Sequence, residues 1–387
     1  METLITFLAI VSFIIGSCIG SFLNVVIYRL PRNLSVNQPR RSFCPNCNYK
    51  IPVYLNIPII SWIILRGKCK NCSAKVSIQY LIVEVITGIL FLLCWYTYGL
   101  TSSGHLQVTY YLVLPGWIFI SLLISASIID YEHQIIPDSI NKIGIIFGLL
   151  CALFFPVISK SIMGNGHYFG NISNDRIESV FLSIIGGGIG FLIIYIIVVF
   201  GKVVFGKKVL SKTTNCKWRI IEGEENPILL YDDQKIRFED VFFVGTERLV
   251  FDTENFNLNG DLVATSKVTV FFDRIVYDNN SVEIADWVSV EGCGNGITYH
   301  REAMGFGDVK YMAMIGVFIG WKGVLFTLFM ASIVGTIIGL PGKIIKGDNA
   351  LSRIPFGPFL SIGALIWLFF GPELLEWYIN LISIGKS

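Results

Sequence analysis

Residues 4–28 read LITFLAIVSFIIGSCIGSFLNVVIY, an apolar run without a charged side chain. A helix needs about 20 predominantly apolar residues to cross the hydrocarbon core of a bilayer, and this run is long enough. A signal peptide would begin with basic residues, whereas Glu2 is the charged residue before this run, and no small-x-small cleavage site follows. We therefore expect residues 4–28 to form a retained transmembrane helix.

The composition of the whole chain is that of a membrane protein. Of the 387 residues, 53% are hydrophobic and 15% are charged, and the mean hydropathy is +0.64. Soluble domains carry about 25% charged residues, so the composition argues against a soluble enzyme, a disordered chain and a nucleic-acid-binding arm. Seven further apolar runs bring the expected number of spans to about eight: 79–98, 108–130, 139–158, 178–203, 309–322, 324–341 and 356–381.

A glycine-rich stretch, Gly186–Gly190, lies inside one of these runs. It resembles a phosphate-binding loop only in its glycines, because no soluble strand precedes it and no Lys-Ser or Lys-Thr pair follows it. Small residues in a membrane helix allow a second helix to approach closely. We therefore expect this stretch to be a helix-packing surface.

One long polar segment interrupts the apolar runs. Residues 205–300 hold ten Lys and Arg against sixteen Asp and Glu, a net charge of −6, whereas the rest of the chain is basic. Short runs in which apolar and polar residues alternate, such as 267–272, are separated by residues typical of turns, such as Asn259-Gly260-Asp261. This pattern predicts a small β-rich soluble domain inserted between membrane helices.

The distribution of Lys and Arg predicts the orientation in the membrane. Residues 29–78 carry nine Lys and Arg and no Asp or Glu, whereas 99–107 carry neither Lys nor Arg. Basic loops stay on the cytoplasmic side. The first loop and the 205–300 insert are therefore expected in the cytoplasm, with both termini outside.

Four of the nine cysteines form two Cys-x-x-Cys pairs in this loop, Cys44 with Cys47 and Cys69 with Cys72. Two such pairs separated by about 20 residues are typical of a structural zinc site, in which four thiolates surround one metal ion. Disulfides are disfavoured in a reducing cytoplasmic loop. A redox-active pair is also disfavoured, because no thioredoxin-like pattern surrounds either pair.

The expected fold class is an all-α polytopic membrane protein with a cytoplasmic zinc loop and an inserted small β-rich domain. The chain divides accordingly into a first transmembrane helix at 1–30, the tetracysteine loop at 31–78, helices 2–5 at 79–204, the insert at 205–300, and helices 6–8 at 301–387.

Two carboxylates stand out. An ionisable side chain in or beside a membrane span costs free energy, so such a residue is by default a candidate functional residue. Asp130 directly follows an apolar run in IIDYEHQIIPD, residues 128–138, where Asp138 is expected to cap the next helix. Asp308 opens a later span in GFGDVK, residues 305–310. Lys310 in that motif is expected to extend its ammonium group to the interface.

Two carboxylates on the same membrane face predict a pair that shares one proton, because like charges a few ångströms apart do not both ionise. One then activates water as a base while the other donates a hydrogen bond to a scissile carbonyl. Two interfacial carboxylates engaged in capping and solvation are the alternative interpretation, and the pattern alone favours neither.

Several motifs together identify a family resemblance. They occur in the order GSFLNVVIYRLP at 20–31, the two Cys-x-x-Cys pairs with NIPIISW at 56–62 and LRGKC at 65–69, the 130–138 segment, Gly-x-Gly-Asp at 305–308, and IPFGPFL at 354–360. In this order they resemble the prepilin peptidases, the membrane aspartic proteases of type IV pilus and type II secretion systems. The resemblance covers 16–200 and 301–370 but not the insert.

The resemblance implies roles for individual residues. Asp130 and Asp308 match the two catalytic aspartates, and the four cysteines match the tetracysteine loop of the bifunctional members. Gly305, Gly307, Lys310, Asp138 and Glu84 fall in the matching segments and are expected to support the site.

The resemblance also implies the reaction. Bifunctional members cut a short basic leader after Gly at the cytoplasmic face of the bacterial inner membrane. They then N-methylate the new terminal residue with S-adenosylmethionine. No residue of this chain is assigned to that methyl donor. The substrate class is the type IV prepilins or the pseudopilins, and the sequence does not choose between them.

Two other functions compete with this one. A presenilin-like intramembrane protease would carry a Tyr-Asp motif, whereas here Asp130 precedes Tyr131, and it would lack the cysteine loop. A transporter or an assembly scaffold is the non-enzyme alternative, but transporters typically show internal repeats, and we find none. The insert ends close to Asp308 in sequence, so gating of the substrate is a hypothesis for it.

Overall fold

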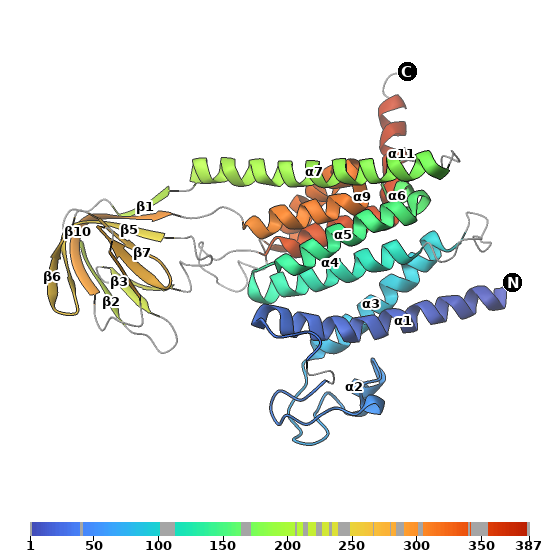
Figure 1. Cartoon of the computed structure of the whole chain (residues 1–387), viewed down its shortest axis with the longest axis horizontal. Coiled ribbons are helices and arrows are strands. Elements are labelled where there is room, and N and C mark those ends of the chain that lie inside the picture. Colours follow the sequence, from blue (N-terminus) through green and yellow to red (C-terminus); the bar gives the residue numbers. More distant parts are fainter. Residues whose placement is uncertain are drawn as a thin grey trace. The chain divides into compact units, whose positions relative to one another are not determined.

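The computed structural model describes most of the chain as two compact units, one helical and one built of strands (Figure 1). The helical unit comprises Met1–Ile193, Gly307–Pro341 and Pro355–Ser387, and the other unit comprises Ile194–Phe306 and Gly342–Ile354. The described residues are 2–38, 42–100, 113–163, 172–205, 207–211, 216–221, 227–231, 234–238, 248–265, 267–278, 280–283, 290–300, 305–339, 341 and 355–384.

The helical unit consists mainly of long apolar helices (Figure 1). They are α1 (Glu2–Arg29), α3 (Ile78–Tyr98), α4 (Leu114–His133), α5 (Asp138–Phe154), α6 (Pro156–Ile162), α7 (Ile172–Phe205), α9 (Phe306–Val334, continued by a π-helix at Gly335–Gly339) and α11 (Gly357–Ile384). The cysteine loop between α1 and α3 contains the short helix α2 (Ile60–Ile64) and 3-10 turns at Leu30–Arg32 and Val53–Leu55.

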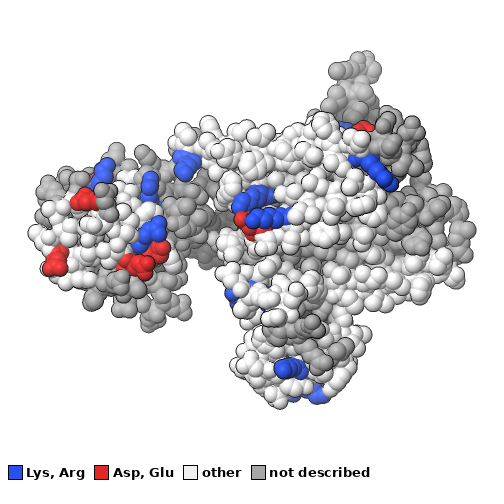
Figure 2. All heavy atoms as spheres, viewed as in Figure 1, with Lys and Arg blue, Asp and Glu red and all other residues white. Residues whose placement is uncertain are grey.

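Among the residues that the structure describes, five helices are long and apolar enough to cross a membrane. They are Thr3–Arg32, Ile78–Tyr98, Leu114–His133, Arg176–Val203 and Phe306–Gly339, with Gly357–Gly371 as a shorter apolar helix. Bulky apolar side chains such as Phe7, Phe181 and Phe200 are exposed on these helices, and the face shown in Figure 2 carries few described charges over the helical unit. Such a surface suits contact with lipid.

The expected number of about eight spans is not confirmed. The runs 309–322 and 324–341 were expected to be separate helices, and α9 does consist of two helical segments that meet at a kink at Gly320, whose φ of 69° and ψ of 176° are not helical. The expected span 139–158 is divided between α5, which has 17 residues, and α6. The beginning of the expected span 108–130 lies outside the described residues.

The glycine-rich stretch of α7 packs against α9, as expected for a helix-packing surface. A Cβ on Gly186 would collide with the backbone at Gly316 and Gly320 of α9, and one on Gly190 would collide with the Met312 carbonyl. The two backbones therefore approach more closely than any larger residue would allow. This contact holds α9, which carries Asp308, against the rest of the helical unit.

The second unit is a small antiparallel β domain, which confirms the β-rich character expected of the insert. Its strands are β1 (Lys207–Ser211), β2 (Cys216–Ile221), β3 (Ile228–Tyr231), β4 (Gln234–Arg237), β5 (Arg248–Leu258), β6 (Asp261–Ala264), β7 (Lys267–Val270), β8 (Arg274–Tyr277), β9 (Asn280–Glu283) and β10 (Val290–His300). The sheet runs β4-β3-β2-β10-β5-β7-β8-β9, with β1 paired to β10 and β6 to β5. Its buried core includes Trp218, Phe251 and Phe256.

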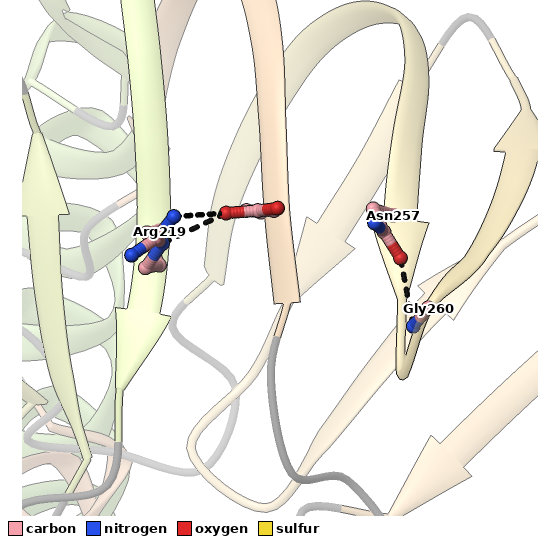
Figure 3. Close-up of polar contacts among 4 residues, drawn as sticks. Arg219, Asn257 and Gly260 are labelled. Atoms are coloured by element: carbon pink, nitrogen blue, oxygen red, sulfur yellow. Dashed lines mark hydrogen bonds and ion pairs between the residues drawn. The ribbon is translucent and has the colours of Figure 1, made fainter.

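Two polar contacts fix local registers in this sheet (Figure 3). Arg219 of β2 lies opposite Glu291 of β10, and its Nε donates to the Glu291 carboxylate over 2.8 Å. The β5–β6 hairpin turns at Asn259 and Gly260, both with positive φ, and the Gly260 N–H donates to Asn257 Oδ1 over 2.8 Å. An Asn-Gly turn of this kind matches the twist of the flanking strands.

Candidate active site and metal centre

Asp130 lies in the last turn of α4 and is buried, with 6% of its surface exposed. The helix ends because Gln134 takes a left-handed conformation, with its N–H donating to the Asp130 carbonyl over 2.9 Å. The Asp130 side chain accepts a hydrogen bond of 2.8 Å at Oδ2 from the backbone N–H of Gly357, the first residue of α11. A carboxylate from α4 is thus held by the N-terminus of a distant helix.

Gly357 leaves room for that carboxylate. A Cβ at this position would lie 2.7 Å from Asp130 Oδ2 and 3.1 Å from its Cγ. Any side chain here would therefore displace either the carboxylate or the start of α11. The IPFGPFL motif was noted for its family resemblance, but no role was predicted for Gly357, because the contact spans 227 positions of sequence.

Asp308 lies in the first turn of α9 and is partly exposed. The preceding Gly307 faces Ile136, whose Cβ would lie 3.5 Å from a Cβ placed on the glycine. Ile136 belongs to the segment that joins α4 to α5. The Gly-x-Gly-Asp motif, which begins at Gly305, thus packs beside the segment that follows Asp130.

A second contact joins the same two segments. The Lys310 ammonium group lies 2.7 and 2.8 Å from the two carboxylate oxygens of Asp138. Asp138 was expected to cap the following helix, and this expectation is wrong. The N-cap residue of α5 is Pro137, and Asp138 lies in the first turn, where it pairs with Lys310 instead. Lys310 was expected to extend to the interface, but its ammonium group is held by this carboxylate.

Tyr311 lies one turn beyond Asp308 on α9 and is fully buried. Its hydroxyl forms a hydrogen bond with Ser361 of α11. The Ser361 hydroxyl also donates to the Gly357 carbonyl over 2.9 Å. A chain of hydrogen bonds therefore runs from Tyr311 of α9 through Ser361 and Gly357 of α11 to the Asp130 carboxylate, and sequence reasoning did not identify Tyr311 or Ser361.

The four paired cysteines come together in the loop between α1 and α3. Their Sγ atoms all lie within 4.8 Å of one another, with Cys44 to Cys72 at 3.8 Å and Cys47 to Cys69 at 4.0 Å. In a tetrahedral site with Zn–S bonds of about 2.3 Å, neighbouring sulfurs lie about 3.8 Å apart. The four thiols therefore fit a tetrahedral metal ion such as zinc.

The two Cys-x-x-Cys turns share one backbone design. Asn48 and Ser73, each directly after the second cysteine of its pair, have φ values of 54° and 57°. Their N–H groups donate to the carbonyls of Cys44 and Cys69 over 2.9 and 3.0 Å. Each turn therefore presents two thiols toward the same point.

Side-chain amides contact the four thiols, and local hydrogen bonds change the pKa values of two of them. Asn46 and Asn71 each donate to a sulfur of the opposite pair, Cys72 at 3.7 Å and Cys47 at 3.6 Å. The pKa of Cys72 falls to about 6, chiefly because the backbone N–H of Ala74 donates to it. The pKa of Cys44 rises to about 11, because burial and contact with the other thiols outweigh the N–H bond from Cys47.

Glu84 anchors the cysteine loop to the membrane helices. This buried residue of α3 accepts the N–H of Ile59 at Oε2 over 2.6 Å. Ile59 has a φ of 65° and a ψ of −56°, a sparsely populated conformation that costs about 1–3 kcal/mol. The carboxylate therefore stabilises a strained turn in the NIPIISW segment. Its position differs from that of the aspartates and gives it a structural role in the loop.

In a comparison with known protein families, two segments of the chain match family models. Residues 14–98 match the bacterial peptidase A24 N-terminal domain, and residues 264–340 match the type IV leader peptidase family. No solved structure matches the chain.

Three similar proteins are each named a prepilin leader peptidase/N-methyltransferase. The protein from Legionella pneumophila is 26% identical over 97% of this chain and 95% of its own length. That from Neisseria gonorrhoeae is 32% identical over 40% of this chain and 68% of its own length. That from Myxococcus xanthus is 40% identical, but the match spans only 38% of this chain and 41% of that protein. This chain belongs to the type IV leader peptidase family.

Proposed function

We propose that this chain is a membrane aspartic endopeptidase that removes the leader of type IV prepilins or type II pseudopilins. The observation that carries the proposal is the placement of the two aspartates. Gly307 packs beside Ile136, in the segment that follows Asp130. Hydrogen bonds through Gly357 and Ser361 also join the Asp130 carboxylate to Tyr311, one turn beyond Asp308. Two carboxylates that share a proton supply both a base for water and an acid for the scissile carbonyl. The relatives' names support the same reaction.

In this mechanism the carboxylates have complementary tasks. The ionised member takes a proton from the attacking water, and the protonated member donates a hydrogen bond to the carbonyl oxygen of the leader peptide bond. The Gly357 N–H orients the Asp130 carboxylate. Gly305 and Gly307, on either side of Phe306, carry no side chains, which leaves room for an extended peptide to pass beside Asp308.

The tetracysteine loop and the names of the relatives support a second activity, N-methylation of the new terminus. Cys44, Cys47, Cys69 and Cys72 would hold a structural zinc ion, which orders the loop when bound. S-adenosylmethionine would supply the methyl group. The basic character of residues 29–78 supports a site that faces the cytoplasm, in a multi-pass protein of the bacterial inner membrane.

Cleavage of a prepilin-type substrate by the detergent-solubilised full chain tests this function. We expect Asp130→Asn and Asp308→Asn each to lose about 10²- to 10⁴-fold in kcat, the usual contribution of a general acid or base. Glu132→Gln is the matched control, because it removes a carboxylate from the same turn of α4, and this side chain is 34% exposed whereas Asp130 is buried.

The product terminus distinguishes the outcomes. Mass spectrometry should find cleavage after Gly and, with S-adenosylmethionine present, an increment of one CH₂ group. Normal cleavage by a folded Asp130→Asn or Asp308→Asn variant would refute the catalytic pair. A wild-type protein that binds prepilin without cutting any prepilin or pseudopilin substrate would favour the scaffold alternative.

A further inference from the structure

The hydroxyl group of Ser361 joins three membrane helices beside the aspartates. Ser361 lies in the second turn of α11 and is buried, with 3% of its surface exposed. Its hydroxyl forms hydrogen bonds with Ser127 of α4 and with Tyr311 of α9. It also donates to the Gly357 carbonyl of its own helix. One serine is therefore the point at which α4, α9 and α11 are linked through hydrogen bonds.

The hydroxyl protons of this group can be assigned from the acceptors around them. Ser361 donates to the Gly357 carbonyl over 2.9 Å, so its oxygen accepts from the other two hydroxyls. A serine oxygen has two lone pairs, and Ser127 and Tyr311 fill both. A second acceptor for Tyr311, the Leu123 carbonyl, lies 3.5 Å away, beyond the usual length of an O–H···O bond. Each hydroxyl proton thus has an acceptor, and a buried network that is satisfied in this way is rigid.

Each of the three helices has a residue of the aspartate site one turn from its contact with Ser361. On α4, Ser127 precedes Asp130 by three positions. On α9, Tyr311 follows Asp308 by the same interval. Residues three or four positions apart lie on the same face of a helix. On α11, the N–H group that binds the Asp130 carboxylate lies one turn before Ser361. The bonds of Ser361 therefore connect the two helical turns that carry the aspartates.

We propose that Ser361 and Tyr311 are positioning residues that set the separation of the two carboxylates. The Tyr311 hydroxyl ties α9, which carries Asp308, to α11, and the start of α11 holds the Asp130 carboxylate. Two carboxylates share a proton only when they lie a few ångströms apart, so a small shift of either helix would disrupt the pair. Tyr311 is fully buried, so it acts through the aspartates and not on the substrate. The inference rests on the peptidase half of the proposed function.

Steady-state cleavage of a prepilin-type substrate by the full chain in detergent tests this proposal. Ser361→Ala removes the shared acceptor, whereas Tyr311→Phe removes one hydroxyl and keeps the ring with its packing. We expect each variant to lower kcat by about 10- to 100-fold, the cost of a displacement of about 1 Å at a reacting group, and to leave KM nearly unchanged. The double variant should lose no more than Ser361→Ala alone, because both substitutions break the same link.

Two control variants remove the same chemical groups away from the aspartates. Tyr98→Phe removes a buried phenol hydroxyl that also bonds α11, but its acceptor is the Leu368 carbonyl, farther along that helix. Ser125→Ala removes a buried hydroxyl of α4 that bonds carbonyls of its own helix. Both controls should keep the kcat of the wild type. If Tyr98→Phe loses as much kcat as Tyr311→Phe, the loss of any bond between helices has this effect and the proposal is wrong.

Hydrogen exchange gives a readout that does not depend on activity. The segment 355–358 reads PFGP and has two amide hydrogens, because proline has none. One of them is the Gly357 amide, which donates to Asp130. In both test variants this amide should exchange at least about tenfold faster than in the wild type, because the start of α11 is no longer held. In the tyrosine control it should exchange at the wild-type rate.

The outcomes separate this inference from the proposed function. Unimpaired kcat in the folded test variants, or exchange of the Gly357 amide at the wild-type rate in both, would overturn the inference and leave the peptidase intact. Faster exchange in the test variants of a protein whose wild type cuts no prepilin would support the link through Ser361 and count against the peptidase alone.

Discussion

The Asp130 carboxylate depends on a residue that has no side chain. Gly357→Ala would place a methyl group 2.7 Å from Asp130 Oδ2, well inside contact distance, so the carboxylate must move. A displacement of about 1 Å at a reacting group costs up to about 10²-fold in rate. We expect kcat for prepilin cleavage to fall by about 10- to 100-fold, with a smaller change in KM, in steady-state assays.

The control for this variant is Gly188→Ala on α7. Nothing lies within 4 Å of a Cβ placed on Gly188, so this substitution adds the same methyl group to open space. Its kcat should equal that of the wild type. A Gly357→Ala enzyme with unimpaired kcat would show that the Gly357 contact does not position Asp130 for the reaction.

The two aspartates could be selected from the sequence because their residue type is costly beside apolar runs. Their partners could not be selected in this way. The Gly357 N–H belongs to the backbone, and Tyr311 and Ser361 look like ordinary residues of apolar helices. The wrong expectation for Asp138 has a related cause, because the competing partner Lys310 lies 172 positions away in sequence.

The cysteine loop owes its structure to four thiols rather than to a hydrophobic core. Structural zinc binding to small peptides contributes roughly 10 kcal/mol or more to folding. Removal of the metal with a chelator, or Cys72→Ser, should therefore unfold the loop locally. We expect trypsin to cut at the exposed residues Lys68, Lys70 and Lys75 at least about tenfold faster.

Mass spectrometry of the tryptic fragments over time measures this change. Cys18→Ser is the matched control, because Cys18 is an exposed cysteine of α1 outside the cluster. The control should keep its metal and its resistance to trypsin. Equal digestion of metal-loaded and metal-free protein would mean that the loop is ordered without the ion.

The contact between α7 and α9 leads to a prediction for two neighbouring glycines. A side chain on Gly186 would meet the α9 backbone at Gly316, whereas one on Gly188 would meet nothing within 4 Å. Gly186→Leu should force the helices apart and lower the free energy of unfolding by about 1–3 kcal/mol or more. Gly188→Leu should have no such cost, since leucine is the better helix former.

Thermal unfolding in detergent, followed by circular dichroism, compares the two variants directly. The Gly186→Leu protein should also lose peptidase activity at temperatures where the Gly188→Leu protein retains it, because α9 carries Asp308. Equal melting temperatures would mean that the two helices do not depend on this close approach. The sequence predicted that the glycines of α7 form a helix-packing surface, but it did not predict that α9 packs against them.

The whole chain combines a lipid-facing helical unit with a polar β domain, and composition alone revealed that division. The number of spans was less accessible, because hydropathy does not show where an apolar helix ends. The break in α9 at Gly320 lies close to the expected boundary between two runs, whereas α5 is apolar but has only 17 residues. The order of the strands in the insert could not be predicted either, because β10 pairs with β1, β2 and β5, which all lie far before it in the sequence.

The insert has the features of a domain that folds on its own. Lys207 and His300, near its two ends, are partners in the β1–β10 ladder, so the chain enters and leaves at neighbouring positions. Its core is contained within the insert and includes Trp218, which stacks on Phe251 with ring centroids 4.3 Å apart. We therefore expect residues 205–300, expressed alone, to be soluble and to unfold in one cooperative transition.

Substitutions of Phe251 and Leu262 test whether the separated insert has a packed hydrophobic core. Phe251 is fully buried, so Phe251→Ala should cost about 3–5 kcal/mol, a large share of the roughly 5–15 kcal/mol that stabilises a small domain. Leu262 is 74% exposed, so Leu262→Ala should change stability by less than about 0.5 kcal/mol. Urea titration, followed by the fluorescence of the buried Trp218, measures both. Similar midpoints for the two variants would show that the insert lacks this core when it is separated from the helical unit.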